Sequence, residues 1–485
     1  MRVRRTNIVI RPNPARVLFR PFAPQDDTRC TKIMARVMAL NDGEVSGLLE
    51  HVLTEFRGRH HHLQQYFLHR FTQMKKFMMT DHALSEERQM LAGSYFTQEY
   101  SVESAALFNP SMVWHPDQSG LPDGSRRFII SLRATGEGHI SSITFRSGVI
   151  DNEGTISLDQ VAPFVTMPQT FPDPFYDKYL FQRTLFELGI VDAFAERVLT
   201  RLGDSFTMKD LRASVRATEL EYRAQSKVVL LSNQRAILAV AEANYELCYE
   251  GEHHISERII FPNSPNESNG LEDARFVRFT DDDGTVKYIA TYTAYDGRVT
   301  LPQMLETLDF LRFKISTLNG PQVQNKGMAL FPRKVNGHYA MLSRQDGENI
   351  FLMYSDELHF WLSRDVLVKP TYGWEFVQLG NCGSPIETDA GWLVLSHGVG
   401  PMRKYSIGAF LLDLNDPSKV IGRLHEPLLT PEVSEREGYV PNVVYSCGGQ
   451  IHGEDLVIPY AMSDYASSFA LVNLRELLST LISSS

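Results

Sequence analysis

The sequence predicts a mainly β fold, a five-bladed β-propeller with an N-terminal helical extension and a helical insertion. One strand pattern occurs five times, and its last four copies recur at about 50 to 60 residues, the size of a propeller blade. Apolar residues with helical spacing gather in two other regions. We therefore expect an arm and helical region at residues 1–99, a propeller at residues 100–480, and a helical insertion at residues 170–247 within it.

The first hundred residues divide into an arm and a helical part. Residues 1–25 alternate apolar and polar positions and contain four prolines, which predicts an extended arm. From Asp42 to about Ala92 the apolar residues follow helical spacing, with Asn41 or Asp42 as the cap of the first helix. A second helix is expected over about Leu63–Met79.

Three adjacent histidines, His60, His61 and His62, stand between these two predicted helices. We interpret them as the solvated start of a helix. The alternative is a metal site, but adjacent side chains on a helix point in different directions and do not converge on one ion. We therefore expect no metal.

The repeated pattern is a large apolar residue, a short apolar strand and a polar residue at the strand end. Its copies are residues 128–133, 288–296, 339–344, 392–397 and 456–464. In a propeller the equivalent strands of all blades converge on one axis, so the terminal polar residues face one central pocket. These residues are Arg133, Asp296, Arg344, His397 and Asp464. The alternative, a β-sandwich with chance similarity between strands, gives no reason for such convergence.

The gap after the first copy is about three times longer than the others. Residues 175–245 within it have helical character, which predicts the insertion.

Composition narrows the function classes. The chain has 485 residues and a net charge of −10, which argues against a nucleic-acid partner. Its four cysteines are far apart without a CxxC pair, which favours free thiols in a reducing compartment. The N-terminus has no apolar signal core, and no apolar run approaches the ~20 residues that span a bilayer. We expect a cytoplasmic protein without a membrane partner.

One acidic motif, Asn269–Arg275, leads directly into the predicted strand Phe276–Phe279. Its acid pair, Glu272 and Asp273, follows Gly270 at the start of a strand, which places the two carboxylates at the mouth of a sheet. The alternative is an ordinary turn capped by an aspartate. Arg275 within the motif supplies a cation beside the acids.

A set of cationic residues suggests an anion site, because arginine forms bidentate contacts with phosphate or carboxylate. Its members are Lys326, Arg344, His397, Arg403 and Lys404. We interpret Arg403 and Lys404 as solvated loop residues. His397 alone would be an ordinary core histidine, and only its shared register with Arg344 makes it a candidate anion ligand.

One acidic centre opposite a basic cluster fits a reaction in which phosphate replaces water. A glycosidase normally uses two carboxylates, whereas phosphate is itself an anionic nucleophile that needs cations to hold it. The sequence has no Gly-rich phosphate loop, no GxSxG elbow and no HExxH helix, which argues against nucleotide-phosphate chemistry and against the serine and zinc hydrolases.

These motifs resemble glycoside hydrolase family 130, the mannoside phosphorylases and related β-mannosidases. The resemblance runs from about Ser104 to Leu477 without the insertion. The matching segments are residues 270–275, 292–297, 325–334, 380–388, 391–398 and 440–444.

The resemblance implies an inverting phosphorolysis of a β-mannoside that yields α-mannose 1-phosphate, with inorganic phosphate as co-substrate and no other cofactor. Asp273 would be the proton donor, relaying through a hydroxyl of the mannosyl unit. The implied phosphate ligands are Arg344, His397, Lys326 and Tyr405. The implied substrate ligands are Asn109, Arg133, Glu272, Asp296 and Asp464.

Two residues depart from the family pattern, and one segment indicates a linkage. Lys326 stands where many members carry arginine, and Gln378 stands where some carry a phosphate-binding lysine. The segment Gly380–Thr388 resembles members that act on β-1,2-linked mannosides.

Other functions remain open. One alternative is a hydrolase with Glu348 or Glu387 as base, and another is a non-catalytic sugar-binding propeller. The helical additions cover the rim, form a contact in a homo-oligomer, or close one end of the pocket and limit substrate length.

Overall fold

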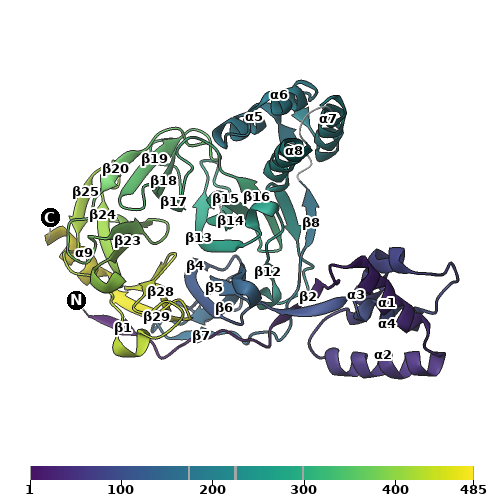
Figure 1. The fold of residues 1–485 in the computed structure, drawn as a ribbon. Coiled ribbons are helices and arrows are strands. Elements are labelled where there is room, and N and C mark those ends of the chain that lie inside the picture. Colours follow the sequence, from purple (N-terminus) through teal and green to yellow (C-terminus); the bar gives the residue numbers. More distant parts are fainter. Residues whose placement is uncertain (1, 173–174, 223–226, 298–299, 484–485) are drawn as a thin grey trace.

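The computed structural model describes residues 2–172, 175–222, 227–297 and 300–483. The fold is mainly β, with two separate groups of helices. Figure 1 shows the sheets arranged around a common centre, with α1–α4 on one side and α5–α8 on another. No helix in the described ranges is both long and apolar enough to cross a membrane.

The N-terminal region contains more structure than an arm and two helices. Its elements are β1 (Val3–Arg5), β2 (Val17–Pro21), α1 (Asp27–Met38), α2 (Asp42–Phe56), α3 (Leu63–Met74), α4 (Glu86–Ser94) and β3 (Thr97–Ser101). Asn41 caps α2 in a capping box with Glu44. The predicted second helix ends early, at Met74, where a 3₁₀ turn over Lys75–Phe77 takes over.

The interpretation of all three histidines as solvated is wrong for His60. Its ring is buried, stacks on Phe19 with 3.8 Å between ring centroids, and places Nε2 2.7 Å from a carboxylate oxygen of Glu99. His62 is exposed at the start of α3. The difference arises because the polypeptide between α2 and α3 folds back onto the antiparallel pair of β2 and β3.

Five units contain most of the strands in the described ranges. They are β4–β7 (Ala106–Trp114, Arg126–Thr135, Ser141–Ile150, Ile156–Leu158); β13–β16 (Gly270–Thr280, Val286–Tyr295, Thr300–Thr307, Arg312–Thr317); β17–β20 (Lys326–Leu330, Tyr339–Arg344, Ile350–Ser355, Asp365–Val368); β21–β25 (Gln378–Asn381, Ile386–Thr388, Gly391–Val399, Tyr405–Leu412, Val420–Arg423); and β26–β29 (Val444–Tyr445, Gln450–His452, Asp455–Met462, Ala466–Asn473). The first two units join where Gly270 pairs in parallel with Ser141.

The five sequence copies form β5, β14, β18, β23 and β28. Each is the strand that follows the first strand of its unit along the sheet. The repeated pattern therefore marks one equivalent position in every unit. The last unit also contains the chain's beginning, because β1 pairs antiparallel with β29 and Val3 lies opposite Val472.

The insertion folds around its own apolar core. Its elements are β8 (Gln169–Pro172), β9 (Tyr176–Asp177), α5 (Lys178–Glu187), α6 (Ala193–Thr200), β10 (Ser205–Phe206), α7 (Met208–Glu221), α8 (Lys227–Glu242) and β11 (Tyr245–Cys248). Phe181, Leu185, Val198, Leu211 and Ile237 belong to this core. The strand β11 pairs with β16, which attaches the insertion to the second unit. The chain continues through β12 (Ile259–Ile260) and ends in α9 (Leu474–Ser483).

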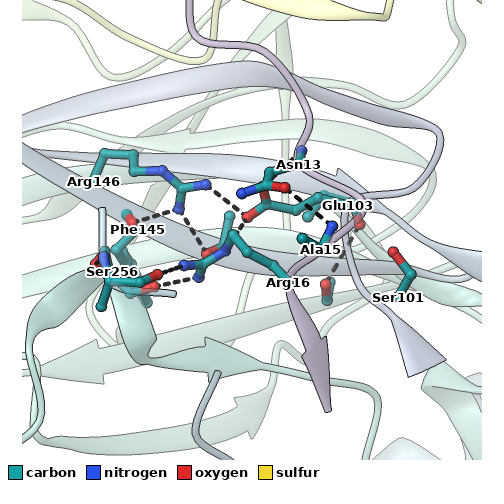
Figure 2. A network of polar contacts seen from close by, with 12 residues as sticks. Asn13, Ala15, Arg16, Ser101, Glu103, Phe145, Arg146 and Ser256 are labelled. Atoms are coloured by element: carbon teal, nitrogen blue, oxygen red, sulfur yellow. Dashed lines mark hydrogen bonds and ion pairs between the residues drawn. The ribbon is translucent and has the colours of Figure 1, made fainter. Parts of the chain in front are cut away.

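A buried ionic network joins the N-terminal segment to the first sheet unit (Figure 2). Glu103 accepts hydrogen bonds from Arg16 Nε at 2.9 Å and from Arg146 Nη2 at 2.7 Å. Arg16 also donates to the carbonyls of Ala162 and Ser256. All three charged side chains are buried. Breaking such a network leaves an uncompensated charge inside the protein. The network therefore fixes the N-terminal segment on the five sheet units, which we call the β body.

Candidate active site

The predicted proton donor lies in a bulge of the first strand of its unit. The pairing of β13 with β14 shifts between Glu272 and Arg275, and Asp273 has a φ of 54°. Aspartate tolerates this left-handed conformation better than most residues. The bulge turns the Asp273 side chain out of the regular alternation of the strand.

A second bulge, in β4, supplies the partner of Asp273. The pairing of β4 with β5 shifts between Phe108 and Ser111, and Asn109 has a φ of 50°. Asn109 Nδ2 donates a hydrogen bond to Asp273 Oδ1 at 2.7 Å. Two neighbouring units therefore use the same local distortion to bring an amide and a carboxylate together.

Two cations hold the acid pair. Arg133 Nη2 donates to Glu272 Oε1 at 2.8 Å, and its Nη1 lies 3.6 Å from Asp273 Oδ1. Lys326 forms an ion pair with the other carboxylate oxygen of Glu272. Glu272 therefore holds both cations in place. The Lys326 side chain forms its ion pair with Glu272 and not with the predicted phosphate site around Arg344.

Arg275, in the acid motif itself, connects the acid pair to the next group. It is buried, and it donates from Nη1 to the backbone carbonyl of Asp273 at 2.9 Å and from Nη2 to the hydroxyl of Tyr445 at 2.8 Å. Its Nε donates to the carbonyl of Cys382 at 2.8 Å. These contacts fix the guanidinium beneath the Asp273 backbone.

The surroundings of Asp273 keep it ionised. Burial alone would raise the pKa of Asp273, but the charges of Arg133 and Arg275, the hydrogen bond from Asn109 and the charge of Lys326 outweigh burial and hold the pKa below its usual value. The carboxylate of Asp273 is therefore ionised at neutral pH.

The predicted phosphate ligands Arg344 and His397 are in direct contact. Arg344 Nη1 lies 3.0 Å from His397 Nε2. Burial and the charges of Arg344 and Arg275 hold the pKa of His397 well below its usual value, so the imidazole is neutral and accepts this hydrogen bond. The ring of Tyr405 lies parallel to His397, with 6.1 Å between the centroids.

Tyr445 lies between the two groups. Its hydroxyl accepts from Arg275, and its ring centroid lies 4.8 Å from that of His397. The acid pair and the Arg344–His397 pair therefore belong to one continuous set of contacts. Neither Arg275 nor Tyr445 was among the predicted site residues, although Arg275 ends the acid motif and Tyr445 directly follows the matching segment 440–444.

Close approach of Arg344 and His397 depends on Gly380. A Cβ atom at this position would lie 2.5 Å from His397 Cε1 and 2.8 Å from Arg344 Cδ, closer than side-chain atoms pack. The glycine leaves room for both side chains at the end of β21.

Asp464 has a different environment from Asp273. It lies in the turn between β28 and β29 with a φ of 50°, and its carboxylate accepts no hydrogen bond from a described residue. Burial and the negative charge of Asp273 raise the pKa of Asp464 to about 6, against the opposing charges of Arg133 and Arg403. This carboxylate is close to the acid pair and available to a ligand.

Asp296 is a predicted ligand next to the helical insertion. It follows β14 and borders a cavity of about 750 Å³ together with Arg235, Leu238 and Glu242 of α8. The two candidate bases for hydrolysis belong to other sheet units than Asp273. Glu348 is exposed in a turn, and Glu387 forms an ion pair with Arg333 beside the far part of β13.

Known proteins were compared with this chain. The family model described as β-1,4-mannooligosaccharide phosphorylase matches residues 213–482. A 1,2-β-oligomannan phosphorylase of Thermoanaerobacter sp. (strain X514) is 37% identical over 219 residues, 44% of this chain and 71% of that relative. A β-1,2-mannobiose phosphorylase of the same strain is 30% identical over 271 residues, 52% of this chain and 85% of the relative.

A solved structure of a β-1,2-mannobiose phosphorylase from Listeria innocua aligns with a TM-score of 0.47 and 20% identity, covering 79% of this chain and 93% of that one.

The sequence matches and the acid and cation groups define a carbohydrate-active enzyme that uses phosphate. The chain belongs to glycoside hydrolase family 130 and is a mannoside phosphorylase of that family.

Proposed function

We propose that this enzyme cleaves β-1,2-linked mannosides with inorganic phosphate, inverting the anomeric carbon to give α-mannose 1-phosphate. The linkage is supported by the names of the two Thermoanaerobacter relatives and by the segment Gly380–Thr388. We further propose that the five sheet units are the blades of a propeller and that the site lies where their first strands converge.

The observation that carries the proposal is the pairing of one acid with a separate cation and imidazole. Asp273 sits among Asn109, Arg133 and Arg275, and Tyr445 links it to the Arg344–His397 pair. Of the two candidate bases for hydrolysis, Glu387 is already paired with Arg333, and Glu348 is exposed in the loop between β18 and β19. Fixed hydrogen-bond donors set apart from the proposed proton donor suit phosphate as the nucleophile.

In the proposed reaction, Arg344 and neutral His397 orient phosphate against the face of the sugar opposite the leaving group. A phosphate oxygen forms a bond to the anomeric carbon while the bond from that carbon to the glycosidic oxygen breaks. Asp273 gives its proton to a mannosyl hydroxyl, which passes its own proton to the leaving oxygen. The proton that phosphate carries restores Asp273.

Phosphate binding also explains how Asp273 becomes an acid. In the free site the surrounding cations keep its pKa low. A phosphate dianion placed near Arg344 offsets this positive potential and adds repulsion to the carboxylate, so the pKa of Asp273 rises when substrates are bound. The low pKa and the donor role are therefore compatible.

We propose that the remaining ligands hold the sugars. The Asp464 carboxylate accepts a mannosyl hydroxyl, and Arg133 and Asn109 donate to others. Asp296 marks the start of the acceptor side, because its cavity is lined by α8 of the insertion. In this proposal residues 1–99 are an N-terminal region, residues 100–480 are the catalytic propeller, and residues 170–247 are an insertion within it. The insertion limits the length of the acceptor.

The test is to incubate the purified enzyme with β-1,2-mannobiose or β-1,4-mannobiose, with and without inorganic phosphate. Phosphorus NMR should show a sugar 1-phosphate only when phosphate and the β-1,2 disaccharide are both present, and proton NMR should show an α anomer. Equal turnover without phosphate would refute the phosphorylase mechanism. Faster turnover of the β-1,4 disaccharide would refute the linkage.

A further inference from the structure

The contact between the N-terminal helices and the β body brings His61 next to Glu257. His61 lies between α2 and α3, and its Nε2 is 3.0 Å from Glu257 Oε2. The ring of His61 packs against Phe164, with 4.0 Å between ring centroids. Glu257 is buried in a 3₁₀ turn (Ile255–Glu257) and accepts a hydrogen bond from Thr166 Oγ1 at 3.4 Å. Phe164 therefore positions the His61 ring, and Thr166 positions the Glu257 carboxylate.

His253 completes a group of three. It lies between β11 and that 3₁₀ turn, and one side-chain donor atom each of His61, His253 and Glu257 lies within 4.8 Å of the other two. Among the described residues, neither ring nitrogen of His253 has a hydrogen-bond partner, and its Nδ1 is buried. A buried nitrogen without a hydrogen-bond partner is unfavourable. The Nδ1 atom of this partly buried imidazole is therefore available to a ligand.

Two imidazoles and a carboxylate form a donor set that suits zinc and neighbouring divalent transition metals. Metal–ligand bonds of about 2.0–2.1 Å place the ligand atoms of a tetrahedral ion about 3.3 Å apart. The 3.0 Å separation of His61 and Glu257 is close to this edge. The donor atom of His253 lies within 4.8 Å of the other two, so its ring must move closer to bind the same ion.

We propose that His61, His253 and Glu257 bind one divalent transition-metal ion, with a fourth position open to water. His62 and Glu250 form a second group that shares His253, but both are exposed. Glu257 is buried and fixed, which favours the first group.

The position of the ion indicates its effect. His61 belongs to the N-terminal region, whereas His253 and Glu257 belong to the segment between β11 and β12. The neighbouring residues Arg59 and His60 already contact Glu99. A metal ion would add a direct attachment between the helices and the β body, through residues that are not among the contacts of Asp273. It therefore stabilises the attachment of the helices rather than taking part in turnover.

The test uses the full-length enzyme without an affinity tag, loaded with Zn²⁺, passed through gel filtration and analysed for metal by mass spectrometry. We expect about one zinc per chain in the wild type and at least tenfold less in His61→Ala, His253→Ala and Glu257→Gln. The control is His338→Ala, because His338 also pairs with one carboxylate, Asp356 at 2.6 Å, in another unit. This control should keep the zinc.

Two further measurements make the result decisive. In the wild type, zinc should raise the melting temperature relative to protein treated with EDTA, and Co²⁺ should give the visible absorption of a four-coordinate site. Circular dichroism establishes that each variant is folded. The proposal is overturned if the wild type retains no zinc, if His61→Ala and His253→Ala retain as much as the wild type, or if His62→Ala alone loses it.

Discussion

Asn109 donates a hydrogen bond to Asp273 at 2.7 Å, and both residues occupy left-handed positions in bulges of neighbouring sheet units. The two bulges remove a residue from each ladder and direct it toward the other. This geometry places the proposed proton donor where Arg133 and Arg275 control its charge. The protonation of Asp273 is therefore the property that mutation tests most directly.

Asp273→Asn should abolish phosphorolysis without disturbing the fold. Asparagine has nearly the same shape, tolerates the same φ, and its amide oxygen still accepts from Asn109. It cannot donate the acid proton, so turnover should fall by about 10²–10⁴. The measurement is release of sugar 1-phosphate, with circular dichroism as the control for folding. Turnover within a few fold of the wild type would show that Asp273 is not the acid.

Gly380→Ala tests the proposed phosphate site through packing alone. The added methyl group would meet His397 Cε1 at 2.5 Å and Arg344 Cδ at 2.8 Å, so their contact must open. We expect the KM for phosphate to rise at least tenfold, while the binding of mannoside measured by calorimetry without phosphate changes little.

Gly373→Ala is the matched control, because a Cβ atom there meets no atom within 4 Å. An unchanged KM for phosphate in Gly380→Ala would contradict a phosphate role for the Arg344–His397 pair.

The sequence predicted the five second strands and the acid motif because both depend on local pattern. Alternation of apolar residues, a preceding turn and a terminal polar residue are visible within ten positions, as in β18 and β23. The shared register of Arg344 and His397 predicted that both face one pocket, and in the structure Arg344 Nη1 lies 3.0 Å from His397 Nε2.

The features that the sequence did not predict are contacts between residues far apart along the chain. Tyr445 reaches Arg275 from 170 residues away. His60 is buried because Phe19, far away in sequence, covers it. His61 acquires His253 and Glu257 only through folding, so an argument from three adjacent histidines could not find them. Asp296 shares the register of the other four repeat residues, yet it lies beside the insertion.

Asp464→Asn should stabilise the enzyme while weakening mannoside binding. Burial and Asp273 raise the pKa of Asp464 from 3.8 to about 6. The ionised carboxylate therefore destabilises the fold above pH 6, by up to about 3 kcal/mol. This cost disappears as the pH falls from 6 to 4. The gain from asparagine, measured by thermal unfolding, should be largest at pH 7–8 and should shrink toward pH 4.

The control for this prediction is Asp389→Asn, which changes an exposed carboxylate in a turn. Its effect on stability should be small and nearly independent of pH. A loss of stability in Asp464→Asn at pH 7.5 would mean that the carboxylate has a favourable partner in the folded enzyme. If its KM for mannoside stayed at the wild-type value, Asp464 would not be a sugar ligand.

Glu103→Gln should destabilise the whole enzyme without changing its active site. Glu103 is buried between Arg16 and Arg146, and it is the carboxylate that compensates both guanidinium groups (Figure 2). Glutamine keeps the shape but leaves two positive charges buried, which costs about 3–5 kcal/mol. Urea unfolding at pH 7.5 should show a lower midpoint, whereas Glu426→Gln at an exposed position should match the wild type. KM values measured at a temperature where the variant is folded should be unchanged. A midpoint equal to that of the wild type would show that solvent or another group neutralises the two arginines, and that the network does not hold the N-terminal segment on the β body.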